Sequence, residues 1–379
     1  MSKPGLILFK FIGANSYKQL ANKTYYGGTK CNPVYKMIKD LRKSFAGHGS
    51  VEHIAKRLET AVEYLQNDGT LTKFLDKKKG VKGFLSNDIS NVYAAIAEIF
   101  ACYDFKNAGF KVFPIDENNQ KPTPDFKIED TNGKVAYVEV NCKNYEKNNN
   151  TVTVCSNSVY NFQNGTKMVS CTSIHSPFGK TTKPTENSII QAIQKISQIK
   201  QGSKQAVNGK PFILYIDLDT GNIRGMSHLF DTTYPIHYSK DGEITSEIIW
   251  HAMYGKKGYP IFERHPYYML PCSKSWWYKL KNKLVKHKNT IPFDKLICTM
   301  NHDGRFLTDH YVSAVIFRCE NHVIICENQY ANNKLHRSTR LHLKRIPKVD
   351  IAKSILNLIP GMIIFKNMRY RYIVRRLLF

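Results

Sequence analysis

The spacing of apolar residues along the chain changes between helical and strand periods in a regular order. Apolar residues three and four positions apart predict three helices, over 33–46, 50–68 and 88–107. Alternating or short apolar runs after the third helix predict three strands, at 110–114, 125–129 and 135–142. A further helix is expected over 186–200, and the apolar run that follows it, 212–216, is typical of a buried strand.

The second half of the chain gives a weaker pattern. A hairpin-like segment is expected over 151–174, two strands at 312–318 and 322–327, and a basic helical region after them. The fold class is therefore α/β: a mixed central sheet flanked by helices, with an N-terminal helical region and a basic C-terminal extension. Four regions are expected: 1–85 helical and basic, 86–220 the core, 221–300 a basic aromatic insertion, and 301–379 the last core strands plus a basic helical tail.

Composition points to a folded protein with a polyanionic partner. Of the 379 residues 42% are hydrophobic, which is enough for a proper core. The 56 Lys and Arg exceed the 30 Asp and Glu, so the net charge is +26. Nucleic acid is the commonest partner for such a charge, and an anionic membrane surface is the second. The nine cysteines form no Cys-x-x-Cys pair, which favours reduced thiols and a cytoplasmic protein, and the late apolar segment 355–365 is too short to span a bilayer.

Three acidic residues lie on the third expected helix and on two of the strands that follow it. Glu98 lies on the third helix, Asp125 follows Pro124 at the start of a strand, and Glu139 lies on the next strand. Carboxylates on a helix and a hairpin can hold Mg²⁺, which prefers oxygen ligands and keeps several of its waters. A metal held in this way serves phosphate chemistry.

This order of elements and motifs resembles the PD-(D/E)XK nuclease superfamily, which has the restriction-endonuclease-like fold. The residues that carry the resemblance are Glu98, Pro124-Asp125, Glu139-Val140-Asn141, Gln194-Lys195 and Gln198, with the strand 212–217 after them. It covers residues 97–218 well, and the late segment 311–335 looks loosely like the terminal strand pair of bacterial members.

The resemblance implies an endonuclease that hydrolyses DNA with Mg²⁺, for which Mn²⁺ can substitute. Glu98, Asp125, Glu139 and the Val140 carbonyl would bind the metal. Asn141 departs from the family pattern, which has a lysine there. Lys143 on the same strand face or Lys195 on the following helix would then serve the nucleophilic water. We favour Lys195, because Gln198 is one turn away and would orient that water.

The turn between the two acidic strands decides whether the site can form. A two-residue Asn132-Gly133 turn places Asp125 opposite Val140, so that Asp125 and Glu139 face opposite sides of the sheet. A type I turn with a left-handed Gly133 and a bulge pairs 130 with 134 and places Asp125 opposite Glu139. Asp at the first turn position and Gly at the fourth favour the bulged turn.

Two basic aromatic segments are candidates for contact with nucleic acid. Their lysines and arginines suit phosphate contacts and their tryptophans suit base stacking. The candidate residues are Lys274, Trp276, Trp277, Lys279, Lys281, Lys283, Arg369 and Arg371. The first segment is equally well explained as an amphipathic element with its tryptophans packed inward. The tail, alternatively, docks a partner or lies on acidic lipid.

The expected partner is DNA, and RNA is the second candidate. No small-molecule cofactor is expected. A homodimer is compatible with cutting two strands. Two other functions remain open. One is a nuclease-like protein that has lost catalysis together with its lysine and only binds nucleic acid. The other is a protein that binds a membrane surface or a protein partner, and only the basic tail supports this function.

Overall fold

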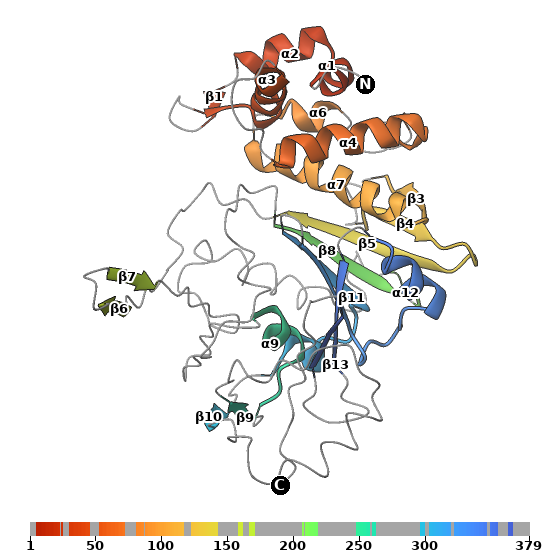
Figure 1. The fold of residues 1–379 in the computed structure, drawn as a ribbon. Helices are drawn as coiled ribbons and strands as arrows, with labels where there is room; N and C mark the ends of the chain where they lie inside the picture. The colour runs from red at the N-terminus through yellow and green to blue at the C-terminus, as the bar shows by residue number, and fades with distance from the viewer. Residues whose placement is uncertain are drawn as a thin grey trace, which may run out of the picture.

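The chain folds around a mixed sheet of eight strands (Figure 1). The computed structural model describes residues 5–22, 24–25, 30–45, 53–72, 81–86, 88–116, 123–142, 158–161, 167–170, 207, 209–218, 248–257, 260–262, 296–299, 303–319, 322–346, 349–354 and 363–366. From one edge to the other the strands are β14 (Ile363–Lys366), β13 (Val349–Ser354), β12 (His322–Glu327), β11 (Ala314–Cys319), β8 (Phe212–Asp217), β5 (Val135–Cys142), β4 (Phe126–Glu129) and β3 (Lys111–Pro114).

The centre of the sheet is parallel and its flanks are antiparallel. Strands β3, β4 and β5 form an antiparallel meander, and β5, β8 and β11 then run parallel to one another. On the far side β12 is antiparallel to β11 and parallel to β13, and β13 pairs with β14 antiparallel. The carboxyl ends of β5, β8 and β11 therefore lie together at one end of the sheet. In open α/β sheets, that end is where ligands are usually bound.

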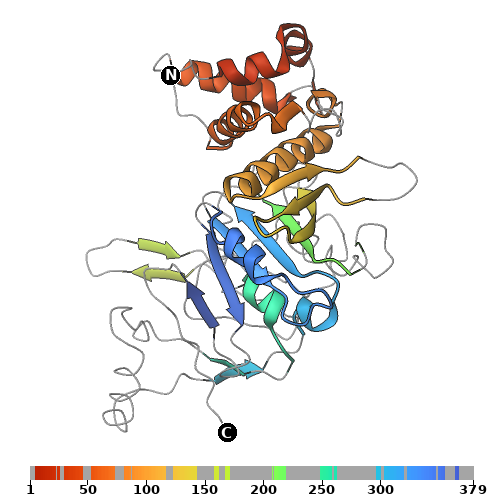
Figure 2. The same cartoon turned by 90° about the vertical axis from the view of Figure 1, so that its right-hand side faces the viewer.

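Helix α7 (Ile89–Asn107) packs against one face of the sheet and separates it from the N-terminal helices. Its apolar side shares a core with alternate residues of the strands, among them Val138, Phe126 and Tyr215. Figures 1 and 2 both show the N-terminal helices stacked on the outer side of α7. They are α1 (Leu6–Ile12), α2 (Ala14–Ala21), α3 (Pro33–Phe45), α4 (His53–Asn67) and the short α6 (Val81–Phe84).

Both ends of α7 are defined by local chemistry. The Asp88 side chain caps the helix by accepting the N–H of Ser90 at 2.9 Å. At the other end Gly109 adopts a φ of 90°, which an L side chain adopts only with strain, and the chain turns into β3. The predicted helix over 88–107, closed by Gly109, is confirmed.

Buried polar groups hold the N-terminal helices in place. The Glu59 carboxylate of α4 accepts the N–H of Gly5 at 2.8 Å and that of Ile7 at 3.3 Å, so it satisfies the first turn of α1. Asn32 accepts the N–H of Val34 at the start of α3 and donates its amide to the Phe84 carbonyl of α6. These bonds link α4 to α1, and α3 to α6, which precedes α7.

The opposite face of the sheet carries α9 (Ile248–Tyr254) and the short α11 (Arg305–Thr308). The Tyr254 hydroxyl donates to the carbonyl of Glu327 at 3.0 Å, which fixes α9 to the end of β12. Three two-stranded pairs complete the described elements: β1–β2 (Thr24–Tyr25 with Lys30–Cys31), β6–β7 (Ser158–Asn161 with Lys167–Ser170) and β9–β10 (Pro260–Phe262 with Leu296–Thr299). The pair β6–β7 matches the hairpin expected over 151–174.

The turn between β4 and β5 has the bulged form that the sequence predicted. Gly133 has a φ of 70°, and its N–H donates to the Asp130 carbonyl at 2.9 Å. The Asp130 N–H pairs with the Lys134 carbonyl at 3.0 Å, and the ladder continues with Glu129 opposite Val135. The two-residue alternative is excluded, because it would shift every pair of β4 and β5 by one residue.

The Asp130 carboxylate also joins this turn to α12 (Arg337–Leu343). It accepts the hydroxyls of Ser338 at 2.5 Å and Thr339 at 2.8 Å, and the N–H groups of Asn132 and Lys134. Burial alone would raise the pKa of Asp130, but the hydrogen bonds from Ser338, Thr339 and the two N–H groups outweigh it and hold the pKa below its ordinary value.

The expected strands at 110–114, 125–129, 135–142, 212–216, 312–318 and 322–327 are confirmed within two residues at each end. The expected helix over 186–200 lies outside the described residues. Among the described residues after β12, the prediction of a helical C-terminal region holds for α12 alone. Residues 349–354 and 363–366 form strands β13 and β14 instead, because β12 offers an open edge and β-branched residues such as Ile351 and Ile363 favour strands.

Replacing Asp130 with Asn is expected to lower the free energy of unfolding by about 1.5–3 kcal/mol at neutral pH, because hydrogen bonds to a charged acceptor are lost. Since the folded-state pKa of Asp130 is depressed, its contribution is present above the unfolded pKa of about 3.9 and is lost as pH falls through the folded pKa. Urea unfolding of both proteins should therefore differ at pH 7, and the difference should shrink as pH falls below the unfolded pKa and through the lowered folded-state pKa of Asp130. A difference that stays the same as pH falls would contradict this role.

Candidate active site

Asp125 lies against β5 at the peptide that follows Glu139. The ladder between β4 and β5 ends with Phe126 opposite Val138, and Asp125 is the bend residue directly before it, so its placement directly opposite Glu139 stays a prediction. The Asp125 N–H donates to the Val138 carbonyl at 2.9 Å, and its carboxylate Oδ2 accepts the N–H of Val140 at 2.7 Å. The carboxylate thus lies directly against the peptide that joins Glu139 to Val140.

The side chain of Asp125 takes the place of a backbone carbonyl. In an uninterrupted ladder with this register, the Val140 N–H would donate to the carbonyl of Pro124. Asp125 is instead a bend residue directly before β4, and its carboxylate is the acceptor. A hydrogen bond from a backbone N–H to a carboxylate is short and strong, so it fixes the direction of the Asp125 side chain.

Glu139 points away from α7. Its neighbours on β5, Val138 and Val140, pack with the core under α7, so alternation places Glu139 on the opposite face. In the sheet it pairs with Leu214 of β8. Glu139 is only 9% exposed, so its carboxylate lies in a surrounding largely shielded from water.

Asn141 lies on the same face, two residues beyond Glu139, opposite Ile216. Its Oδ1 is buried and accepts no hydrogen bond within the part of the chain that the structure describes. A buried amide oxygen without a donor costs about 1–3 kcal/mol. Close to the paired acids there is therefore an acceptor that a cationic or hydroxyl donor would satisfy.

Glu98 lies at the middle of α7 and is half-buried. The helix covers the sheet face opposite to that of Glu139, and in the described residues no three His, Cys, Asp or Glu side chains are grouped closely enough to hold a metal. Glu98 as a third ligand therefore stays a prediction.

The remaining candidate residues lie outside the described part of the chain. They are Lys143, Lys195, Gln198, Lys274, Trp276, Trp277, Lys279, Lys281, Lys283, Arg369 and Arg371. Their roles also stay predictions.

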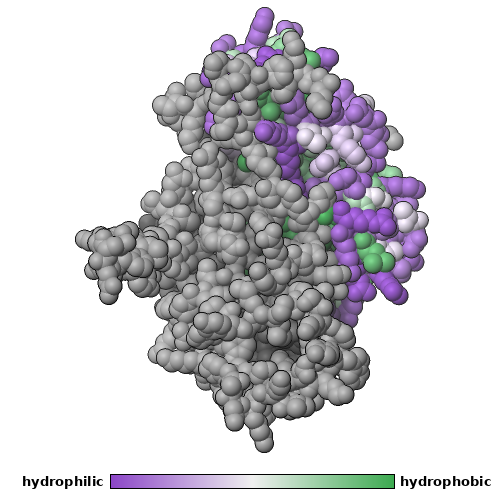
Figure 3. Space-filling model, viewed as in Figure 1, coloured by the Kyte–Doolittle hydropathy of each residue, from purple (hydrophilic) through white to green (hydrophobic). Residues whose placement is uncertain are grey.

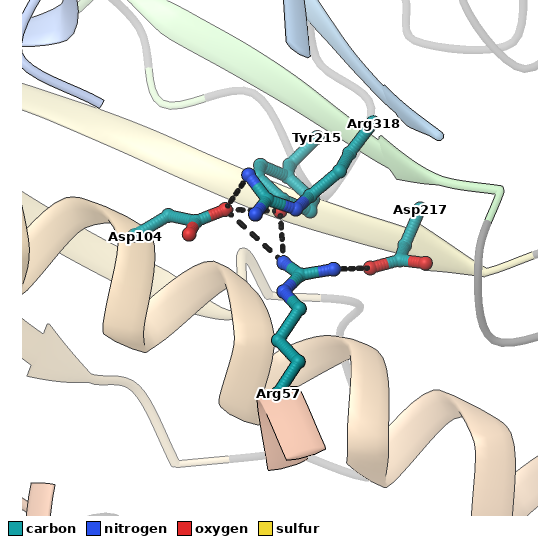
Figure 4. Close-up of polar contacts among 5 residues, drawn as sticks. All are labelled: Arg57, Asp104, Tyr215, Asp217 and Arg318. Atoms are coloured by element: carbon teal, nitrogen blue, oxygen red, sulfur yellow. Dashed lines mark hydrogen bonds and ion pairs between the residues drawn. The ribbon is translucent and has the colours of Figure 1, made fainter. Parts of the chain in front are cut away.

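A second polar centre is buried under α7 and α4, where it joins both helices to the sheet (Figure 4). The Asp104 carboxylate accepts the hydroxyl of Tyr215 at 2.6 Å. Arg57 and Arg318 approach the same Oδ2 atom of Asp104 at 3.3 and 2.9 Å. Arg57 also lies 3.7 Å from the carboxylate of Asp217. Two arginines and two aspartates therefore balance in charge within one buried network.

The network spans four elements. Arg57 belongs to α4, Asp104 to α7, and Tyr215 and Asp217 to β8; Arg318 pairs with Asp217 across the parallel ladder from β11. The Arg57 guanidinium also stacks on the Phe100 ring, 3.8 Å from its centroid. Burial and the neighbouring Asp104 charge raise the pKa of Tyr215 well above its ordinary value, so its hydroxyl stays protonated and donates.

The network around Asp104 was not predicted from the sequence, although the sequence contains a signal for it. Each charged member interrupts an apolar pattern: Asp104 in α7, Asp217 at the end of the run of β8, and Arg318 in the apolar strand β11. Charged residues at core positions are rare unless they are paired. Three such interruptions in one core indicate a network, although the partners can be assigned only in three dimensions.

No known protein family, curated protein or solved structure matches the chain in sequence or fold comparisons. The described surface seen in Figure 3 is mostly hydrophilic, with scattered small hydrophobic areas. Among the described helices, none combines the length and the apolar character needed to cross a bilayer.

Replacing Asp104 with Leu should lower the free energy of unfolding by about 3–5 kcal/mol, because it leaves buried arginines without their shared partner. The matched variant Tyr215→Phe removes two hydrogen bonds, one donated to Asp104 and one accepted from Arg57, but keeps the ion pairs, and should cost about 1–3 kcal/mol. Urea unfolding followed by circular dichroism measures both. Equal and small losses would show that the network contributes little beyond the hydrogen bonds of Tyr215.

Proposed function

We propose that this protein is a Mg²⁺-dependent endonuclease that hydrolyses DNA phosphodiester bonds on a restriction-endonuclease-like core. One observation carries the proposal: the Asp125 carboxylate is held at 2.7 Å from the N–H between Glu139 and Val140. The order of α7, β3, β4, β5 and the parallel β8 supports it, since it is the order that the sequence motif requires. The net charge of +26 suits a polyanionic substrate.

The donor set around this peptide fits a hard divalent cation. Asp125, Glu139 and the carbonyl of Val140 would offer oxygen atoms alone, and Mg²⁺ completes its shell with waters and a substrate phosphate. Glu98 would complete the set, directly or through a water. When bound, the metal supplies charge neutralisation at the phosphate and a more acidic water.

The protein groups would divide the remaining work. The hydrogen bond from Val140 holds Asp125 in one orientation, so the carboxylate needs no reorganisation when substrate binds. Lys195 or Lys143 would donate to the nucleophilic water, and Gln198 would orient it. The Oδ1 of Asn141 accepts no hydrogen bond from the residues that the structure describes, and this supports a donor at this position, since a lysine ammonium would satisfy it.

The alternative is a nuclease-like protein that binds nucleic acid without cutting it. Asn141 favours this function, because the usual lysine of the motif is replaced by a residue that carries no charge. The two functions share the substrate and the fold and differ only in the chemical step.

Cleavage of supercoiled plasmid in Mg²⁺ or Mn²⁺ separates them. The variants Asp125→Asn and Glu139→Gln should each reduce the cleavage rate at least about a hundredfold, because each removes a charged oxygen donor from the metal. Asn at 125 keeps an oxygen that accepts the Val140 N–H, so the fold should be preserved.

Glu129→Gln is the matched control. Glu129 lies on β4 four residues from Asp125, and its carboxylate pairs only loosely with Lys111, at 3.8 Å. This variant should cut as fast as the unaltered protein. Equal cutting by all four proteins would indicate a contaminant, whereas metal-independent binding with no cutting would establish the binding protein.

A further inference from the structure

The sheet face that carries Glu139 also presents an aromatic ring and a lysine to solvent. Phe113 of β3, Lys127 of β4 and Tyr137 of β5 are direct cross-strand neighbours. Phe113 is 41% exposed, one of the few large apolar side chains exposed among the described residues. The Lys127 ammonium lies 4.8 Å from the centre of its ring.

This row lies next to the paired acids. Along their own strands Lys127 and Tyr137 are two residues from Asp125 and Glu139, a distance of about 6.6–6.8 Å in an extended strand. A single nucleotide strand crossing the meander would touch both the row and the acids.

The chemistry of the row matches an unpaired nucleotide. A base stacks on an exposed aromatic ring only when its face is free, which excludes bases inside an intact duplex. The lysine beside the ring suits the phosphate of the same strand, and its contact would add to the salt dependence of binding. Within the row the charge is positive, in agreement with the charge of the whole chain.

We propose that Phe113 and Lys127 bind single-stranded DNA beside the acidic pair, so that the preferred substrate carries an unpaired segment. Phe113 stacks on a base and Lys127 contacts the adjacent phosphate. Alignment of that strand with Asp125 and Glu139 rests on the proposed nuclease function, but the binding itself does not require metal or cleavage.

Fluorescence anisotropy in EDTA tests the binding without the chemistry. The probes are a fluorescein-labelled oligothymidylate and a labelled blunt hairpin duplex of the same number of nucleotides. Phe113→Leu should weaken single-strand binding about tenfold, because a stacked base is lost, and leave duplex binding within about twofold. Lys127→Gln should lower the slope of log K against log salt by about 0.7 on the single strand.

Tyr330→Leu and Lys334→Gln are the controls. Tyr330 is 40% exposed and follows β12 at the opposite end of the sheet, with Lys334 exposed close by in the sequence. Both variants should bind the two probes as the unaltered protein does, and thermal unfolding should show that all four variants are folded.

Unchanged single-strand binding by Phe113→Leu would overturn the proposal, and so would an equal loss on both probes. These outcomes are independent of the nuclease test. If Asp125→Asn cuts as fast as the unaltered protein while Phe113→Leu loses single-strand affinity, the catalytic assignment fails and the binding surface stands.

Discussion

The register between β4 and β5 determines where every side chain of these strands lies. A shift by one residue would turn Asp125 to the opposite face from Glu139 and expose Phe126 and Ile128, which are fully buried against α7. The turn fixes this register, because Gly133 occupies the left-handed region and Asp130 satisfies the N–H groups of the loop. Core packing and turn chemistry thus favour the same alignment.

The polar networks on either side of this hairpin give the site a rigid support. At the turn, Asp130 fixes α12 through Ser338 and Thr339. Under α7, Asp104 gathers Tyr215 and two arginines, so that α4, α7, β8 and β11 cannot shift independently without leaving a buried charge. Such networks specify one arrangement of elements more than they add stability, because desolvation of the charges offsets much of their attraction.

The sequence alone predicted the main elements of the core and the form of the hairpin turn. Helix α7 and the strands β3, β4, β5, β8, β11 and β12 follow from apolar spacing, and the bulge follows from Asp130 and Gly133. The docking of α12 on the turn was not predictable, because its partners are more than 200 residues apart and each is a common surface residue type. Strands β13 and β14 depend on the open edge of β12, which no local pattern reveals.

The candidate site was only partly open to prediction. The register that brings Asp125 close to Glu139 followed from counting residues across one turn, which is local information. The hydrogen bond from Val140 to Asp125 depends on the bend directly before β4, and the network around Asp104 depends on contacts among four elements.

Binding of Mn²⁺, followed by the loss of its free-ion electron paramagnetic resonance signal, tests the metal site most directly. We expect saturable binding by the intact protein, strong weakening in Asp125→Asn and in Glu139→Gln, and no change in Glu129→Gln. Equal Mn²⁺ binding by all four proteins, or none by the unaltered protein, would contradict a divalent-metal site at the Glu139–Val140 peptide.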